Sequence, residues 1–434
     1  MHYISTRNAD HTVQLGEAIA RGIAPDGGLY VPTEFPHFTT RQFEADVELP
    51  QIGATLLAPF AAGDPLAAEL PAICQEAFDF PAPLVSLPNA PAPLSVLELF
   101  HGPTSAFKDF GARFLAACLE RIRRGQRRKL TMLVATSGDT GGAVAAAFHN
   151  KPWVDVAVLY PQGRVSERQA QQLACWGGNV RTFAVRGSFD DCQRIVKEAF
   201  ADPALAETHQ LSSANSINIG RLLPQMVYFA QAGLQLWRES GRRANFIVPT
   251  GNLGNALACI WARHVGVPIG EIVLATNANQ SITEYLRTGE WAPRPSVTTL
   301  ATAMDVGDPS NMERLRALHP DFEELQGQIG ASSVDDIEIR GTIRRDSHEL
   351  DRLWCPHSAT AAKVLRRLLA RGARGHWVIV ATAHPAKFNE IVEAQTGREA
   401  PVPASLARLL ALPRQETELD PTLDALRGEL QKNR

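Results

Sequence analysis

The chain has 434 residues, of which 45% are hydrophobic and 21% are charged, a composition typical of a globular protein with a large core. Its 43 lysines and arginines are balanced by 46 aspartates and glutamates, for a net charge of −3. This balance excludes the strong basic bias of proteins that bind nucleic acids or acidic membranes, and the length favours two or three domains.

Cysteine spacing and hydropathy favour a soluble, cytoplasmic protein. The first residues, MHYISTRNAD, contain no basic head followed by an apolar core, so no signal peptide is expected. No stretch approaches the roughly 18 consecutive apolar residues of a membrane-spanning helix. The six cysteines form no CxxC pair, which indicates reduced thiols and gives no reason to expect a metal site.

The first ninety residues contain apolar segments interrupted by glycine and proline, and we expect them to form a smaller N-terminal domain. The proline-rich run at 80–94 reads FPAPLVSLPNAPAPL. Such a run predicts a linker or an extended crossing segment between that domain and the rest of the chain.

Beyond this run, short β-branched segments alternate with longer alanine- and leucine-rich segments of helical spacing. Such alternation predicts βαβ units, hence an α/β fold with mostly parallel sheets and helices on both faces. The expected domains are 91–235 and 236–434, and the charged tail from about residue 415 is expected to be helical or frayed. The predicted strands are 95–100, 131–135, 154–159, 180–185, 245–249, 271–276 and 376–382.

Parallel sheets bind ligands at the carboxyl ends of their strands, and the first such end carries a lysine. The segment after 95–100 reads HGPTSAFKDFG and places Lys108 at the start of a predicted helix, beside Phe107 and Phe110. Partial burial there lowers the pKa of an amine, as attack on an aldehyde requires. The alternative is a solvated lysine at a helix start, which is the commoner case for a lysine considered alone.

The second strand end reads TSGDTGG and precedes a predicted helix at 141–148. Free amides at a helix N-terminus bind anions, and the hydroxyls of Ser137 and Thr140 add further donors. An ordinary capped turn, with Asp139 or Thr140 as the N-cap, explains the same pattern.

The third strand end reads TGNLGNAL, with glycines at 251 and 254. These glycines let the backbone approach an anion closely, and the following helix favours negative charge. The loop has neither the lysine of a P-loop nor the GxGxxG spacing of a dinucleotide fold, so one small phosphate suits it best. A tight connection with an asparagine cap is the alternative.

Two further polar groups of residues complete the set of candidates. Thr382 ends the last predicted strand, where its hydroxyl can bond a heteroaromatic nitrogen, although a strand-end threonine needs no such role. The segment 212–225, SSANSINIGRLLPQ, gathers several polar side chains around the start of an apolar helix. N-capping explains one or two of them, and the rest suggest recognition of an anionic ligand.

Taken in this order, the segments resemble the threonine synthases, members of the tryptophan-synthase-β-like (fold type II) group of pyridoxal-phosphate enzymes. The resemblance covers nearly the whole chain and includes an N-terminal signature as well as the motif around Lys108. It is carried by YISTRN (3–8), EAIARGIAPDGGLYVP (17–32), HGPTSAFKDFG (101–111), ATSGDTG (135–141), NSIN (215–218), PTGNLGN (249–255), AMDVGDPSN (303–311) and ATAHPAKF (381–388).

The resemblance implies pyridoxal 5'-phosphate bound as a Schiff base to Lys108, with Thr382 at the pyridine nitrogen. Asp139 stands where many members of the wider group carry asparagine, so its role, at the cofactor O3′ or at the substrate, is left open. The cofactor phosphate is expected on Gly251, Asn252, Leu253, Gly254 and Asn255. The candidate substrate-binding residues are Thr136, Ser137, Asp139, Thr140, Ser213, Asn215, Ser216, Asn218 and Arg221.

The implied reaction converts O-phospho-L-homoserine and water to L-threonine and phosphate, the last step of threonine biosynthesis. The Lys108 amine would remove the Cα proton and carry later protons. A phospholyase or dehydratase on the same scaffold, or a non-catalytic small-molecule binder, are the alternatives, and the missing dinucleotide fingerprint disfavours a dehydrogenase. We expect a monomer or homodimer with no nucleic-acid or membrane partner.

Overall fold

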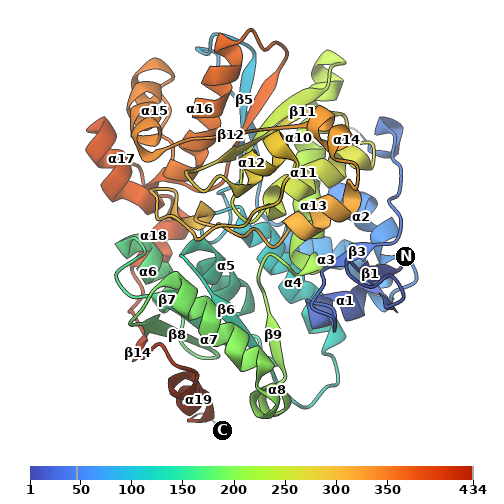
Figure 1. The fold of residues 1–434 in the computed structure, drawn as a ribbon, viewed down its shortest axis with the longest axis vertical. Coiled ribbons are helices and arrows are strands. Elements are labelled where there is room, and N and C mark those ends of the chain that lie inside the picture. The colour runs from blue at the N-terminus through green and yellow to red at the C-terminus, as the bar shows by residue number, and fades with distance from the viewer. Residues whose placement is uncertain (45–46, 433–434) are drawn as a thin grey trace.

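Two sheets organise the chain, which the computed structural model describes over residues 1–44 and 47–432 (Figure 1). The larger sheet has six strands in the order β12-β11-β10-β13-β5-β4, parallel except for the edge strand β4. Its strands are β4 (Leu84–Ser86), β5 (Leu94–Glu98), β10 (Ala244–Pro249), β11 (Ile269–Thr276), β12 (Ile329–Ser333) and β13 (Trp377–Ala381).

The smaller sheet has five strands, all parallel, in the order β14-β8-β7-β6-β9. Its strands are β6 (Leu130–Ala135), β7 (Val154–Pro161), β8 (Val180–Val185), β9 (Leu211–Ser213) and β14 (Thr417–Leu419). The predicted α/β fold with mostly parallel sheets is therefore confirmed, and all seven predicted strands are present.

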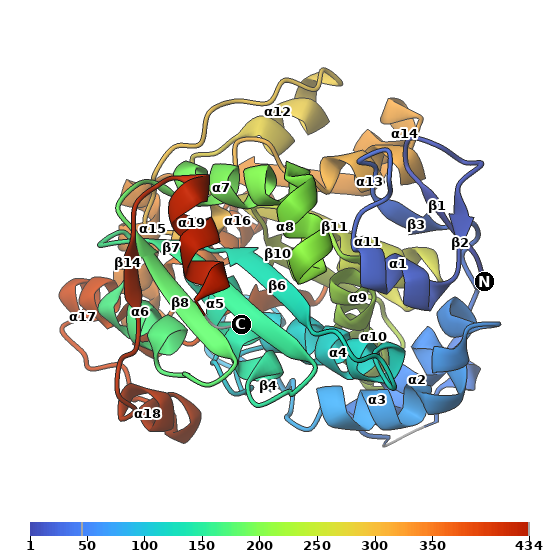
Figure 2. The ribbon, with the colours of Figure 1, turned by 90° about the horizontal axis from the view of Figure 1, so that it is seen from below.

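Helices cover both faces of each sheet because successive strand residues point to opposite faces. Phe246 and Val248 of β10 face α10 and α11, whereas Ile247 faces α16. Across the smaller sheet, Val134 faces α4 and α5, and Leu133 faces α7 and α19, which lie side by side in Figure 2. These helices are α4 (Lys108–Ile122), α5 (Asp139–Phe148), α7 (Phe189–Ala201), α10 (Met226–Ser240), α11 (Gly254–His264), α16 (Pro356–Ala370) and α19 (Leu423–Gln431).

The N-terminal residues form a three-stranded antiparallel sheet and three helices, of which the first and third pack against α4 and the second against α10. They comprise β1 (Tyr3–Ser5), β2 (Thr12–Val13), β3 (Tyr30–Pro32), α1 (Leu15–Arg21), α2 (Leu49–Leu57) and α3 (Leu70–Ala77). The remaining helices are α6 (Glu167–Ala174), α8 (Pro203–His209), α9 (Ile219–Leu222), α12 (Ser281–Thr288), α13 (Met312–Leu318), α14 (Phe322–Gln328), α15 (Asp336–Glu349), α17 (Asn389–Thr396) and α18 (Ala404–Leu410).

Two segments differ from their predictions. The proline-rich run is not only a linker, because β4 within it pairs antiparallel with β5. The tail contains the expected helix, α19, but β14 before it pairs with β8, which the sequence did not predict. The division at residues 90 and 235 stays a prediction, and both sheets are assembled across it. No helix in the described ranges is long and apolar enough to cross a membrane.

Candidate active site

Lys108 begins α4 and lies beside the end of β13, in agreement with its predicted place at a helix start. The loop that carries it is fixed to the segment after β13 by two backbone hydrogen bonds. Phe107 N donates to Thr382 O at 2.9 Å, and His384 N donates to Ser105 O at 3.0 Å. The two residues that the sequence singled out on distant strands, Lys108 and Thr382, are thereby brought together.

The Lys108 amine is held in a form suited to nucleophilic attack. Desolvation lowers the pKa of this amine from 10.5 to about 8, the charge of Asp139 acts in the opposite direction, and the charges of Arg221 and Lys387 lower it further. Within the described ranges, the amine forms no hydrogen bond or ion pair and lies 5.8 Å from the centre of the Phe107 ring. An unpaired amine with a depressed pKa is the nucleophile that an aldehyde cofactor requires.

Asp139 belongs to a buried ion pair rather than to a helix cap. The N-cap of α5 is Gly138, with a φ of 132°, so neither Asp139 nor Thr140 has the capping role considered above. The Oδ1 atom of Asp139 accepts from Lys387 Nζ at 2.8 Å and from Gln169 Nε2 at 3.0 Å. Burial acts to raise the pKa of this carboxyl, but the charges of Lys387 and Lys108 outweigh it and hold the pKa below its usual range.

Two of the hydroxyls in the 136–140 loop are open to a ligand. Thr136 Oγ1 accepts from the amides of Gly138 and Gly141 and donates to Gly138 O, so it shapes the loop itself. Ser137 and Thr140 are partly exposed, and their hydroxyls form no hydrogen bond with any residue of the described ranges. The loop therefore presents Ser137, Thr140 and the N-terminus of α5 for anion binding.

The loop between β10 and α11 has the geometry of a phosphate cradle. Leu253 adopts the left-handed conformation with a φ of 62°, and α11 begins at Gly254 with free amides behind it. A Cβ at Gly251 would lie 2.7 Å from Met304 Cα, so only glycine fits there. Asn255 Nδ2 is buried without a partner in the described part of the chain, so this donor is available to a bound ligand.

The cradle and the 212–225 segment form one unit. Asn252 Nδ2 donates to Ser216 Oγ at 2.6 Å, and Asn311 Nδ2 donates to Asn252 O at 2.9 Å. Arg221 is buried, donates to Ala214 O and leaves its Nε without a partner among the described residues. The segment that is bonded to the cradle thus carries a buried arginine with one unpartnered nitrogen.

Not every polar residue of the 212–225 segment faces a ligand. Asn218 caps α9 by accepting from Gly220 N at 2.9 Å, and its amide donates to Ile19 O of the N-terminal domain at 3.0 Å. Ser213 Oγ accepts from Asn215 N at 3.3 Å and shapes the turn. Asn218 is therefore a structural residue, and the open positions are Ser216, Asn215 and Arg221.

Three buried residues near the site were not among the site residues expected from the sequence. His357, at the start of α16, accepts from Ala303 N through Nε2, and its Nδ1 has no partner in the described ranges. Burial lowers the pKa of His357 to about 4, so its imidazole is neutral. Lys387 and Arg314 are the other two, and only the three-dimensional arrangement brings them to the site.

Arg314 connects the N-terminal domain to the cradle. Its guanidinium donates to Tyr30 O at 3.0 Å, to Asn311 Oδ1 at 2.8 Å and to Ile217 O at 2.6 Å. Because Asn311 bonds the cradle at Asn252 O, this buried arginine joins the first domain to the loop that would hold a phosphate.

Buried positive charge exceeds buried negative charge around these loops. Lys387 is paired with Asp139, whereas Arg221 and Arg314 form no ion pair with any described residue. Unpaired buried cations are costly unless an anion joins them. The arrangement thus suits ligands that carry phosphate or carboxylate groups.

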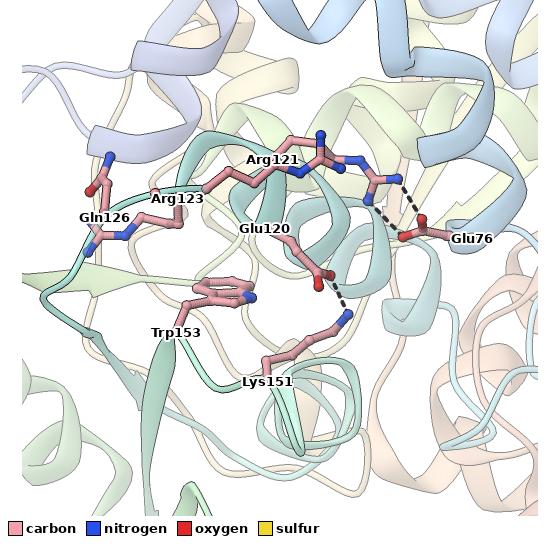
Figure 3. Close-up of a pocket in the computed structure, with 9 residues that line it drawn as sticks. Glu76, Glu120, Arg121, Arg123, Gln126, Lys151 and Trp153 are labelled. Atoms are coloured by element: carbon pink, nitrogen blue, oxygen red, sulfur yellow. Dashed lines mark hydrogen bonds and ion pairs between the residues drawn. The ribbon is translucent and has the colours of Figure 1, made fainter.

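A surface depression of about 500 Å³ at the far end of α4 has a different character (Figure 3). It is lined by Arg121, Arg124 and Lys151, each paired with a carboxylate on α3, just before it or on α4. Arg121 lies thirteen positions after Lys108 along α4, or about 20 Å at the rise of an α-helix. The paired charges of the depression fix α3 and the segment after α5 to α4 and take no part in the site.

Comparison with known proteins gives consistent matches. The family described as pyridoxal-phosphate dependent enzyme matches residues 77–383, threonine synthase N terminus matches 2–78, and threonine synthase, C-terminal, matches 358–428. The chain is 39% identical to the threonine synthase of Serratia marcescens, over all of this chain and 98% of that protein.

Two solved structures are similar along the whole chain. The crystal structure of threonine synthase from Escherichia coli matches with a TM-score of 0.91 and 36% identity, over 100% of both chains. A pyridoxal-phosphate-bound threonine synthase from Brucella melitensis matches with a TM-score of 0.89 and 34% identity, over 99% of this chain and 98% of that one.

Proposed function

Because the chain belongs to the threonine synthase family of pyridoxal-phosphate-dependent enzymes, we propose that it converts O-phospho-L-homoserine and water to L-threonine and phosphate. The observation that carries the proposal is the unpaired, desolvated amine of Lys108 beside a phosphate cradle and two unpaired buried arginines. A cofactor and a substrate that both bear phosphate match this distribution of charge.

The residues present fit pyridoxal phosphate. The amides of 251–255 and the unpartnered Asn255 Nδ2 would hold its phosphate, Lys108 would hold its aldehyde carbon, and Thr382 would face its ring nitrogen. When bound, this cofactor supplies an electron sink for charge that develops on the substrate. A hydroxyl at the ring nitrogen, in place of a carboxylate, leaves that nitrogen largely unprotonated.

The protein's own residues bind the substrate and move its protons. Lys108, with a pKa of about 8, is able to take the Cα proton near neutral pH and return protons to later positions. Arg221 Nε, Ser216 and the open hydroxyls of Ser137 and Thr140 are the proposed ligands of the substrate phosphate and carboxylate. Orientation by these groups favours loss of phosphate over competing eliminations.

The test is turnover together with covalent labelling. The purified protein should release phosphate from O-phospho-L-homoserine and form threonine, and borohydride should fix the cofactor to Lys108. Lys108→Ala should abolish both, and labelling that persists in this variant would refute the assignment. Phosphate release without threonine, or turnover of serine or threonine alone, would instead indicate a phospholyase or a dehydratase.

We further infer that the enzyme acts in the cytoplasm as a monomer or homodimer. All six cysteines are buried and free, which supports a reducing compartment. Sedimentation at two protein concentrations tests the oligomeric state.

A further inference from the structure

Lys387 is a buried lysine that lies outside the cofactor and substrate sets. It belongs to the 3₁₀ turn Pro385–Phe388 after β13, and 1% of its side chain is exposed. Its Nζ donates to Asp139 Oδ1 and to Thr104 O, both at 2.8 Å. It therefore contacts the first residue of α5 and the loop that carries Lys108.

The contact with Thr104 bears directly on the catalytic lysine. The amide and the hydroxyl of Thr104 both donate to Asp109, at 2.9 and 2.7 Å, and Asp109 follows Lys108 in the chain. Gln172 Nε2 donates to the same Thr104 carbonyl at 3.1 Å. Lys387 thus helps to fix the backbone from which Lys108 extends.

The contact with Asp139 occupies only one side of the carboxylate. Oδ1 accepts from Lys387 and Gln169, whereas Oδ2 accepts from no residue in the described ranges. A buried carboxylate needs a cation, and two lysines lie near this one. Lys387 forms the ion pair, and the Lys108 amine stays unpaired.

We propose that Lys387 is a positioning residue of the reaction centre, which keeps the Lys108 amine free by serving as the counter-ion of Asp139. The inference rests on the proposed function of Lys108. In the absence of Lys387, Lys108 is the nearest remaining cation for the Asp139 carboxylate. A Lys108–Asp139 pair would stabilise the protonated amine, which is no nucleophile and no base.

The other charged groups around the pair act in known directions. The charges of Lys387, Lys108 and His357 would each lower the pKa of Asp139. His357 is neutral at working pH, because burial lowers its pKa to about 4. The pKa of the Lys108 amine is raised by the charge of Asp139 and lowered by the charges of Arg221 and Lys387, so only Asp139 favours the protonated amine. Removal of Lys387 therefore takes away a group that opposes protonation and leaves the one group that favours it.

The experiment measures how easily the Lys108 amine is deprotonated, with no substrate present. The full-length chain, stripped of cofactor, is reductively methylated with formaldehyde over a range of pH, and modification of Lys108 is followed by peptide mass spectrometry. Lys387→Met should raise the pH at which half of Lys108 is modified by about one pH unit or more, the usual effect of a close opposite charge. Lys387→Arg, which keeps the charge, should stay near the wild type, and Lys387→Met with Asp139→Asn should return toward it.

The acid limb of the pH profile of kcat/KM in the holoenzyme should move in the same order. A midpoint that stays unchanged in Lys387→Met, with only a lower melting temperature, would show a purely structural role and overturn the proposal. If Lys387→Met does not fold, Lys387→Gln decides by the same criterion, because its amide keeps a donor for Asp139. If the variants show these shifts but the wild-type chain does not turn over O-phospho-L-homoserine, the proposed function is refuted and the role of Lys387 is not.

Discussion

Gly251→Ala tests whether the cradle depends on close approach of two backbones. The added Cβ would lie 2.7 Å from Met304 Cα and 3.1 Å from both the carbonyl carbon and the oxygen of Met304. These are backbone atoms, so no side-chain rotation relieves the clash, and one of the two loops must move. Overpacking of this kind costs about 1–3 kcal/mol. If the whole cost opposes cofactor binding, the affinity for the cofactor falls roughly 5- to 150-fold.

We expect the strain to fall mainly on the cofactor, because the empty loop can shift and the loaded loop cannot. The assay titrates the stripped protein with pyridoxal phosphate and follows the visible absorption band. Gly341→Ala, at an exposed position of α15 where a Cβ meets nothing within 4 Å, is the matched control and should bind the cofactor as the wild type does. An unchanged cofactor affinity in Gly251→Ala would show that the backbone at 251 does not approach the phosphate.

Three further variants test separate parts of the site. Arg221→Met should raise KM for O-phospho-L-homoserine at least tenfold in steady-state assays and leave the cofactor spectrum intact, since its free Nε is assigned to the substrate. Arg314→Lys should lose on the order of 2–3 kcal/mol in denaturant unfolding, because an ammonium cannot reach the three acceptors that the guanidinium bonds. Burial raises the pKa of Asp109 from 3.8 to about 6, so the folded state keeps a proton that the unfolded state releases. The wild type should therefore lose stability relative to Asp109→Asn as the pH rises from about 4 through 6, and parallel melting curves across that range would contradict the shift.

The parts of the site that follow a strand were predictable from the sequence, and the reason is topological. The 250–255 loop and Thr382 come directly after parallel strands, and Lys108 ends the loop that follows another one; such strand ends meet at one edge of the sheet. The seven predicted strands have five to eight residues, most of them apolar. Strands of three residues, such as β4, β9 and β14, contain too few positions for a pattern to emerge.

The residues that support the site were not predictable, because their roles depend on contacts between distant segments. Lys387 enters the sequence analysis only as part of the ATAHPAKF segment (381–388), and nothing local indicates that it pairs with the carboxylate of Asp139 at the start of α5. Asp139 was weighed as a helix cap, since sequence cannot distinguish a capping carboxylate from one turned toward a buried lysine. Arg314 lies in an ordinary helical pattern, and two of its three acceptors, Tyr30 O and Ile217 O, belong to segments far away in the sequence.

The pairing of β5 with β13 and of β14 with β8 has a consequence for how the chain is made. Ser95 and His376, which hydrogen-bond across the first of these pairs, are 281 positions apart. The ribosome therefore releases β5 long before its partner exists, and the smaller sheet keeps an open edge until the last residues emerge. Such high contact order predicts slow, late folding and exposes strand edges to aggregation in the meantime. Removal of residues 416–434 should thus reduce the soluble yield during synthesis more than it alters the chemistry at Lys108.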